Sequence, residues 1–142
     1  MATTKVQLRS IAGTEAVAGW AAAHTLVVDR PDGKAGGNDL GFTGGQLLAL
    51  AIGGCLCNDI HAVAHDLGIA VRHIEVDVEL TLEGESPMVA GTQVFVTIAA
   101  AASGATIEEL YRKAVAGSAV GNSVQRGFPV KFALMADALG EG

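Results

Sequence analysis

The residue of this chain best suited to covalent chemistry is Cys55, which lies in the run LLALAIGGCLCNDIHAVAHDLGI at positions 47–69. Its thiolate form would be a nucleophile, whereas a thiol buried in an apolar helix is usually inert packing. The Gly53–Gly54 pair directly before it costs about 1 kcal/mol per glycine in a helix relative to alanine. Because that cost needs a compensating contact, we expect another segment to pack closely against this turn. Both interpretations of Cys55 stay open at this point.

Three potential metal ligands, Cys57, His61 and His65, recur four residues apart along one face of the same helix. The rise of a helix places the first and the last about 12 Å apart, too far for one ion to contact all three. We therefore expect no metal and no other cofactor, and we assign Cys57 to helix packing. Cys55 and Cys57 point to different sides of the helix, so they cannot bridge each other. We expect a reduced, cytoplasmic protein.

The composition argues against two classes of partner. The chain has 15 acidic and 9 basic residues, a formal charge of −6 and no basic stripe, so it would repel phosphate backbones. Its longest apolar stretch, 47–56, has about ten residues, whereas a membrane-spanning helix needs about 20. The N-terminal residues MATTKVQLRSIAG lack the apolar core of a signal peptide. We expect neither a nucleic acid nor a membrane as a partner.

Hydrophobic periodicity predicts the elements that position Cys55. Residues 5–30 have the pattern of strands with two breaks, and 30–45 is a long loop rich in Gly, Asp and Asn. Apolar residues recur at helical spacing from about Gly44 to Leu67, and Gly68 follows as a C-cap. Apolar residues surround most of the first three helical turns, so we expect this half to be buried nearly all round.

The second half of the chain predicts a hairpin, a second helix and a last strand. Apolar residues alternate strictly with acidic residues or Thr at 74–83, and a returning strand follows at 94–98. The sequence Thr106–Glu109 fits a capping box that opens the second helix, and 130–134 alternates as a closing strand. The expected fold class is α+β, with an antiparallel sheet packed on a helix, and residues 1–142 are expected to form a single domain.

Together these parts resemble the OsmC/Ohr family of thiol-dependent hydroperoxide reductases over nearly the whole chain. The resemblance is carried by the glycine-rich loop 36–45, the run QLLALAIGGC, the strand HIEVDVELTL, and SAVGNSVQRG before the closing strand. It implies an intertwined homodimer whose antiparallel sheets wrap around long buried central helices, with active sites at the interface. It also implies that Cys55 is the peroxidatic thiol, which attacks an organic hydroperoxide and becomes a sulfenic acid in an oxidative stress response.

The resemblance also implies three further site positions, and the chain departs from the family at each of them. Ser118 stands where the family has a resolving cysteine, so oxidised Cys55 would need an external thiol reductant. Trp20 falls near the activating arginine, and Gly45 falls at the glutamate that orients it. We therefore expect Ser118, Trp20 and Gly45 at the resolving position or in the substrate pocket. A capping role for Ser118 at a helix start is the alternative.

We expect an OsmC-like protein with Cys55-based thiol chemistry on a small apolar organic substrate, nearest to organic hydroperoxide reduction. Activity would be weak, because the resolving cysteine and the activating residues are missing, unless Arg30 or Arg126 reaches the thiol. One alternative is a catalytically inactive relative that binds a small molecule. Another is a diverged enzyme in which Cys55 is the nucleophile of a thiol or sulfur transfer.

Overall fold

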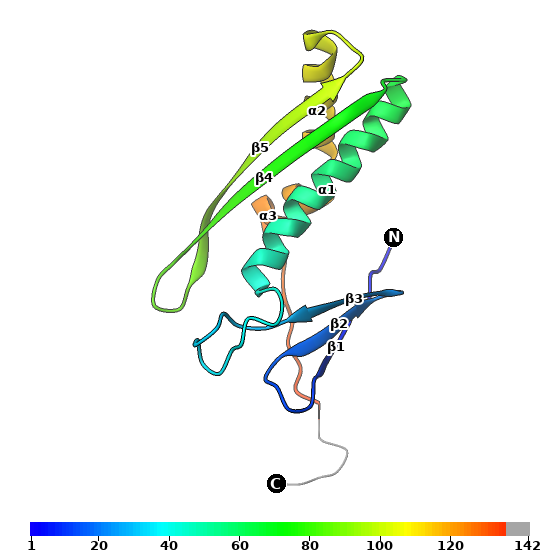
Figure 1. Cartoon of the computed structure of the whole chain (residues 1–142). Helices are drawn as coiled ribbons and strands as arrows, with labels where there is room; N and C mark the ends of the chain where they lie inside the picture. Colours follow the sequence, from blue (N-terminus) through cyan, green and yellow to red (C-terminus); the bar gives the residue numbers. More distant parts are fainter. Residues whose placement is uncertain (136–142) are drawn as a thin grey trace.

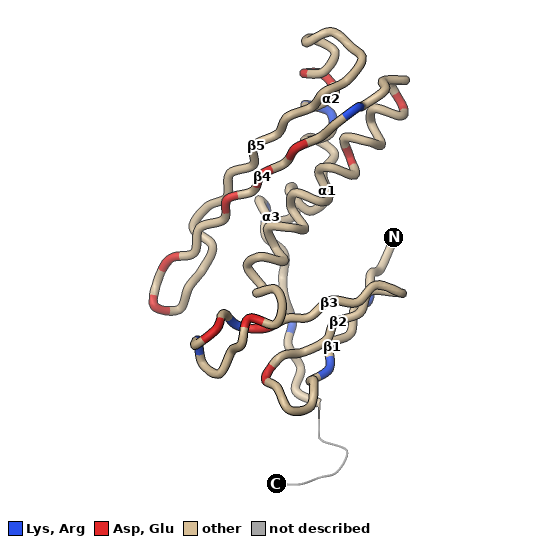
Figure 2. Tube along the Cα trace, in the orientation of Figure 1, with Lys and Arg blue, Asp and Glu red and all other residues tan. Residues whose placement is uncertain are grey.

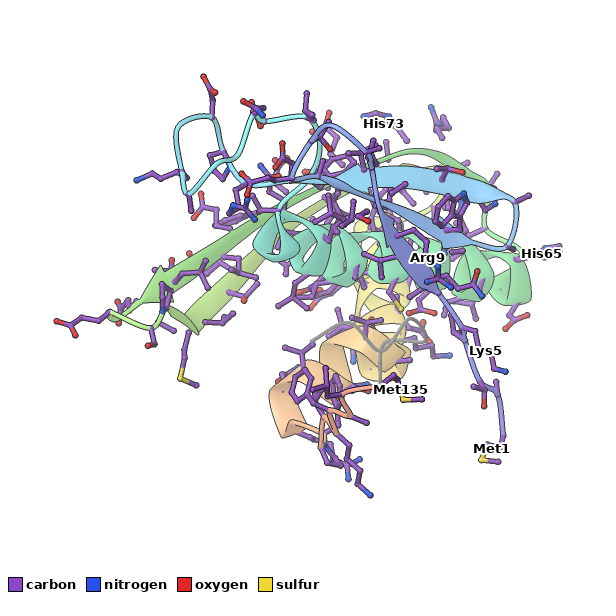
Figure 3. The ribbon with its side chains drawn as sticks, turned by 90° about the horizontal axis from the view of Figure 1, so that it is seen from below. Met1, Lys5, Arg9, His65, His73 and Met135 are labelled. Atoms are coloured by element: carbon purple, nitrogen blue, oxygen red, sulfur yellow. The ribbon has the colours of Figure 1, made fainter. Side chains whose placement is uncertain are left out.

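The computed structural model describes residues 1–135, which form two antiparallel sheets and three helices arranged about the long helix α1 (Figure 1). In chain order the elements are β1 (Gln7–Ser10), β2 (Val17–Ala21), β3 (His24–Val28), α1 (Gly44–Leu67), β4 (Val71–Glu83), β5 (Met88–Ala100), α2 (Gly104–Gly117) and α3 (Ala119–Arg126). Seen from below, the N-terminal strands lie above α1, and the α2–α3 pair lies beneath it (Figure 3). The α+β prediction is confirmed, with two sheets in place of the single sheet expected.

Helix α1 has the bounds that its sequence predicts, and both ends are capped. The Thr43 hydroxyl accepts from the backbone N–H of Gln46 at 3.2 Å, and the Gln46 side chain accepts from the Thr43 N–H at 2.9 Å. This reciprocal capping box satisfies donors that a helix start leaves free. At the other end Gly68 adopts a left-handed φ of 68°, as expected of a C-cap glycine.

The hydrophobic core lies between α1, α2 and the β4–β5 hairpin. Strands β4 and β5 pair over almost their whole length, with Val76 opposite Val96. Alternate apolar residues of the hairpin, such as Ile74, Val96 and Ile98, pack against the core, whereas the acidic residues that follow one another along β4 (Figure 2) are exposed. The alternation in the sequence is thereby confirmed. The buried cluster consists of Leu56, Ile60 and Ala64 from α1 with Leu110 and Ala114 from α2.

Gly53 packs closely against β4. A Cβ atom built on Gly53 would lie 2.9 Å from Val78 Cγ2 and 3.4 Å from Val76 Cγ1. Any side chain at this position would therefore push the helix away from β4. The expected close contact is confirmed for Gly53 but not for Gly54, where a Cβ atom meets nothing within 4 Å.

The N-terminal sheet is joined to the start of α1 by the segment that follows β3. Its strands are ordered β1-β2-β3, all antiparallel. The backbone N–H of Phe42 donates to Val27 O at 2.9 Å, and the Asp29 N–H donates to Phe42 O at 3.1 Å. These bonds return the chain to the edge of β3 immediately before Thr43, so the sheet fixes where α1 begins.

Two sequence predictions for the second half of the chain are wrong. Helix α2 is capped by Ser103, whose hydroxyl accepts from the Thr106 N–H at 3.2 Å, so Thr106 lies inside the first turn. Ser103 and Thr106 are both of residue types that are common at the N-cap. Ser103 caps α2 because its hydroxyl accepts the otherwise free N–H of Thr106 in the first turn. The segment after Ser118 contains α3, and no strand is found between 127 and 135. Phe132 and Leu134 there are almost fully exposed, and the segment has no strand beside it within the described chain.

The first half of α1 is also less covered than its sequence predicts. Leu50 is 55% exposed, although apolar residues surround these turns. By length and composition α1 is the one helix among residues 1–135 that could cross a membrane. It packs in this fold against β4 and α2, and its second half carries Asp59, His61, His65 and Asp66.

Candidate active site

Cys55 lies on a half-buried side of α1 and makes a hydrogen bond within that helix. Its free thiol donates to Asp59 Oδ2 at a Sγ···O distance of 3.7 Å. The spacing of four residues places both side chains on the same helix face, one turn apart. The partner that the described chain gives this thiol is therefore a carboxylate and not the cation that its activation would require. Sequence analysis missed this contact, although the i, i+4 spacing was available to find it.

Cys57 lies on the side of α1 that faces the hairpin, away from Asp59. It lines an open, mostly apolar cavity of about 530 Å³ together with Leu50, Gly53 and Val78. Both cysteines are free thiols. The assignment of Cys57 to helix packing is thus only partly right, because Cys57 also lines this open cavity.

Ser118 is buried at the junction of α2 and α3, with 5% of its surface exposed. It occupies the N-cap position of α3, yet its side chain makes no capping hydrogen bond. Its hydroxyl has no partner among the described residues. It lines a cavity of about 130 Å³ with Ile52 and Leu56, which come three residues before Cys55 and one residue after it. The structure thus places the expected resolving position next to the Cys55 turn, although Cys55 does not line that cavity.

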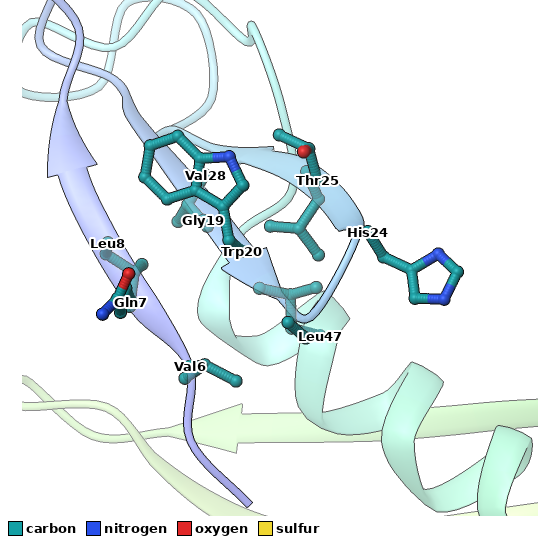
Figure 4. Close-up of a pocket in the computed structure, with 11 residues that line it drawn as sticks. Val6, Gln7, Leu8, Gly19, Trp20, His24, Thr25, Val28 and Leu47 are labelled. Carbon is teal, nitrogen blue, oxygen red and sulfur yellow. The ribbon is translucent and has the colours of Figure 1, made fainter.

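Trp20 and Gly45 lie near the start of α1. Trp20 extends from β2 over an apolar cavity of about 260 Å³ whose wall also includes Leu47 of α1 (Figure 4). Gly45 is in the first turn of α1, where a Cβ atom would lie 3.6 Å from Leu82 Cδ1. Trp20 therefore lines a cavity, but Cys55 is not among the residues that line it, so the assignment of Trp20 to the substrate pocket stays a prediction.

The two arginines considered as activating cations have other positions. Arg30 pairs with Glu15 at 3.6 Å, and its Nε donates to the carbonyl groups of Lys34 and Ala35. Arg126 lies in the last turn of α3 and is exposed. Within residues 1–135 neither side chain is a hydrogen-bond partner of Cys55. Asp59 is therefore the side chain that the described residues give the Cys55 thiol as a hydrogen-bond partner.

Asp29 is a buried carboxylate that sequence analysis did not single out. It accepts backbone N–H groups from Leu40 at 3.1 Å, Asn38 at 3.0 Å and Arg30 at 2.8 Å. The hydrogen bond from Leu40, with those from Asn38 and Arg30 and the nearby Arg30 charge, holds the pKa of Asp29 below its ordinary value despite burial. Asp29 thus folds the long loop back toward β3 and has a structural role.

Cys57, His61 and His65 do not form a metal site with other residues in this structure. Among residues 1–135, no group of three or more His, Cys, Asp or Glu side chains comes close enough to hold an ion.

The family model for OsmC-like proteins matches residues 36–133, which include α1, the hairpin, α2 and α3. The chain belongs to the OsmC-like protein family. None of the curated protein sequences compared with this OsmC-like chain matches it. The individual proteins that it resembles therefore come from the comparison with solved structures.

Several solved structures share this OsmC-like fold. An OsmC-like protein from Mycoplasma pneumoniae superposes with a TM-score of 0.74 at 13% identity, covering 87% of this chain and 88% of that chain. An organic hydroperoxide resistance protein, OsmC, from Legionella pneumophila has a TM-score of 0.59 at 20% identity, with coverages of 88% and 90%. One from Elizabethkingia anophelis has a TM-score of 0.60 at 17% identity, with coverages of 88% and 89%. The chain is thus a distant relative of organic hydroperoxide resistance proteins.

Proposed function

We propose that this OsmC-like protein reduces small, mostly apolar organic hydroperoxides with Cys55 and is regenerated by an external thiol. The observation that carries the proposal is the Cys55–Asp59 hydrogen bond. Cys55 stands at the family's peroxidatic position. This hydrogen bond gives its thiol a neighbouring carboxylate that can take up and return a proton. The kinship with hydroperoxide resistance proteins supports the same chemistry.

In the first step Cys55 Sγ attacks the terminal oxygen of the hydroperoxide. The sulfur–oxygen bond forms as the oxygen–oxygen bond breaks, so sulfur is oxidised to the sulfenic acid and the peroxide is reduced. Asp59 accepts the thiol proton and passes it to the departing alkoxide, which leaves as an alcohol. Because the hydrogen-bond partner that the described residues give Cys55 is a carboxylate and not an activating cation, we expect this step to be slow.

In the second step an external thiol completes the cycle. It attacks the sulfenic sulfur, which forms a mixed disulfide and releases water, and a second thiol frees Cys55 and leaves as an external disulfide. Ser118 cannot supply the resolving sulfur from within the chain. Cys57 cannot supply it either, because helix geometry separates the two thiols. Such dependence on an external thiol suits a reduced, cytoplasmic location.

The proposal includes a homodimer that completes the site. The chain exposes 10655 Å² of surface, well above the roughly 6,800 Å² expected for a folded monomer of 14.3 kDa. Large apolar side chains are among the exposed residues, including Leu50, Phe128, Val130 and Phe132. A second copy would cover these surfaces and bring its own groups to the Cys55 turn. We assign Trp20 and Gly45, near the start of α1, to the substrate pocket of that assembly.

Consumption of cumene hydroperoxide by the purified full chain, with dithiothreitol as reductant, tests this function. We expect thiol-dependent consumption that Cys55→Ser abolishes. Cys57→Ser is the matched control on the same helix and should retain it. Equal consumption by wild type and Cys55→Ser would overturn the proposal.

A second candidate function is binding without catalysis. It is favoured by the carboxylate beside Cys55 and by the buried hydroxyl of Ser118, which has no hydrogen-bond partner among residues 1–135. Such a protein would bind a small molecule in the fold's apolar cavities, and peroxide would leave Cys55 unmodified.

A further inference from the structure

Two exposed histidines, His61 and His65, lie one turn apart on the second half of α1. Side chains four residues apart on a helix are neighbours, with about 5–6 Å between their Cβ atoms. Two imidazoles at this spacing on one helix face can bind the same metal ion, as they do in zinc enzymes with a helical His-x-x-x-His pair. Figure 3 shows His65 at the surface, at one end of α1. The pair is therefore accessible to an ion from solvent.

Cys57 is a rival partner for His61, because it lies four residues before it. The structure distinguishes the two pairs. Cys57 is half-buried and lines the cavity beside the hairpin with Gly53 and Val78, whereas neither histidine lines that cavity. The span of about 12 Å excludes one ion on all three residues but does not exclude the pair of His61 and His65. Exposure on both sides of the pair thus favours the two histidines.

The surroundings of this pair attract a cation. The sequence of α1 contains no Lys or Arg, and Asp66 directly follows His65. His65 lies in the last turn of α1, where the partial negative charge of the helix C-terminus stabilises a positive ion. Imidazole nitrogen suits Zn²⁺, Cu²⁺ and Ni²⁺, whereas Mg²⁺ and Ca²⁺ prefer oxygen ligands. The ligand chemistry therefore selects a divalent transition metal.

We propose that His61 and His65 form a two-histidine binding site for a divalent transition-metal ion such as Zn²⁺. Each imidazole supplies one nitrogen, and water completes the coordination. Because the described residues contain no group of three or more potential ligands, one chain gives the ion these two side chains. The site goes beyond the proposed thiol chemistry, since the hydrogen-bond partner of Cys55 is Asp59 and not a histidine. The bound ion joins two successive turns and stabilises the end of α1.

Zn²⁺ is the probe for this site. Its dissociation constant and stoichiometry are measured on the reduced full-length protein by isothermal titration calorimetry, and we expect one ion per chain. His61→Gln and His65→Gln should each weaken binding by about tenfold or more, because a single ligand replaces a chelating pair. Zn²⁺ should also raise the Tm of wild type, and raise it less in either variant. Because both histidines are exposed, the variants should unfold like wild type in EDTA.

Two control variants test the rival ligands. Cys55→Ser/Cys57→Ser removes both thiols, and His73→Gln removes the histidine that pairs with Glu75 at 3.0 Å. Both controls should bind Zn²⁺ like wild type, and Mg²⁺ should not compete, because it prefers carboxylates. The proposal is overturned if Zn²⁺ does not bind, if neither His61→Gln nor His65→Gln weakens binding, if either control weakens it as much as they do, or if Mg²⁺ competes.

Discussion

Cys55 and Asp59, one turn apart on α1, are joined by a hydrogen bond from the thiol to the carboxylate over 3.7 Å. The contact has two opposite consequences. A thiol that donates this hydrogen bond is held to the carboxylate, which restrains its attack on an electrophile. The same carboxylate can carry the thiol proton to a leaving alkoxide, which a hydroperoxide needs and many other electrophiles do not.

Asp59→Asn separates these two effects. We expect alkylation of Cys55 by iodoacetamide to become about two- to tenfold faster, because iodide leaves without a proton and the opposing charge is gone. Hydroperoxide reduction should fall by about tenfold or more, because the proton carrier is lost. Stopped-flow measurement of both rates, with Asp66→Asn as an exposed control on the same helix, makes the comparison. If both rates rise together, Asp59 only restrains the thiol and carries no proton.

Gly53→Ala tests the close contact between α1 and β4. The added Cβ atom would lie 2.9 Å from Val78 Cγ2, a stiff side chain within a strand. Overpacking of about 1–3 kcal/mol outweighs the gain in helix propensity of about 1 kcal/mol, so the free energy of unfolding should fall by about 1 kcal/mol. Urea denaturation measures it, with Gly104→Ala as the control because a Cβ atom there meets nothing within 4 Å. A more stable Gly53→Ala protein would contradict this packing.

Asp29→Asn tests the role of the buried carboxylate in the loop. Because the pKa of Asp29 is lowered in the folded protein, the charged carboxylate stabilises the fold at pH values above its ordinary pKa of 3.8. That contribution is lost as the pH falls through 3.8 toward the lowered native pKa. The difference in unfolding free energy between wild type and variant should therefore be constant near neutral pH and shrink in acid. Denaturation at several pH values checks this, with exposed Asp32→Asn as control; a difference that does not change with pH would argue against the role.

Leu50→Glu tests the proposed dimer. Leu50 is 55% exposed in one chain and lines the open cavity beside Cys57. A charge buried there in an interface is strongly unfavourable, so the variant should dissociate or lose stability while wild type sediments as a dimer at micromolar concentration. Ala105→Glu adds the same charge near the start of α2, where the helix dipole tolerates it, and should sediment like wild type. A folded wild-type monomer at that concentration would exclude the dimer.

The sequence was informative where a local pattern determines the structure. The bounds of α1, its Gly68 cap and the alternating β4 strand are set by periodicity and by single-residue chemistry, and these predictions are confirmed. The closing strand at 130–134 was predicted wrongly, because alternation describes a strand's faces but provides no neighbour to pair with. The unpartnered state of Ser118 depends on where Asn122 and Ala116 lie, which no pattern in the sequence reveals.

The most direct test of the proposed function is the chemical state of Cys55 after one equivalent of cumene hydroperoxide. The oxidised full-length protein is treated with dimedone, which traps sulfenic acids, and is mapped by mass spectrometry without reduction. We expect one dimedone adduct at Cys55, none at Cys57, and a mixed disulfide at Cys55 when a small thiol is added first. An unmodified Cys55 under conditions that consume no peroxide would contradict the account and favour a protein that binds small molecules without catalysis.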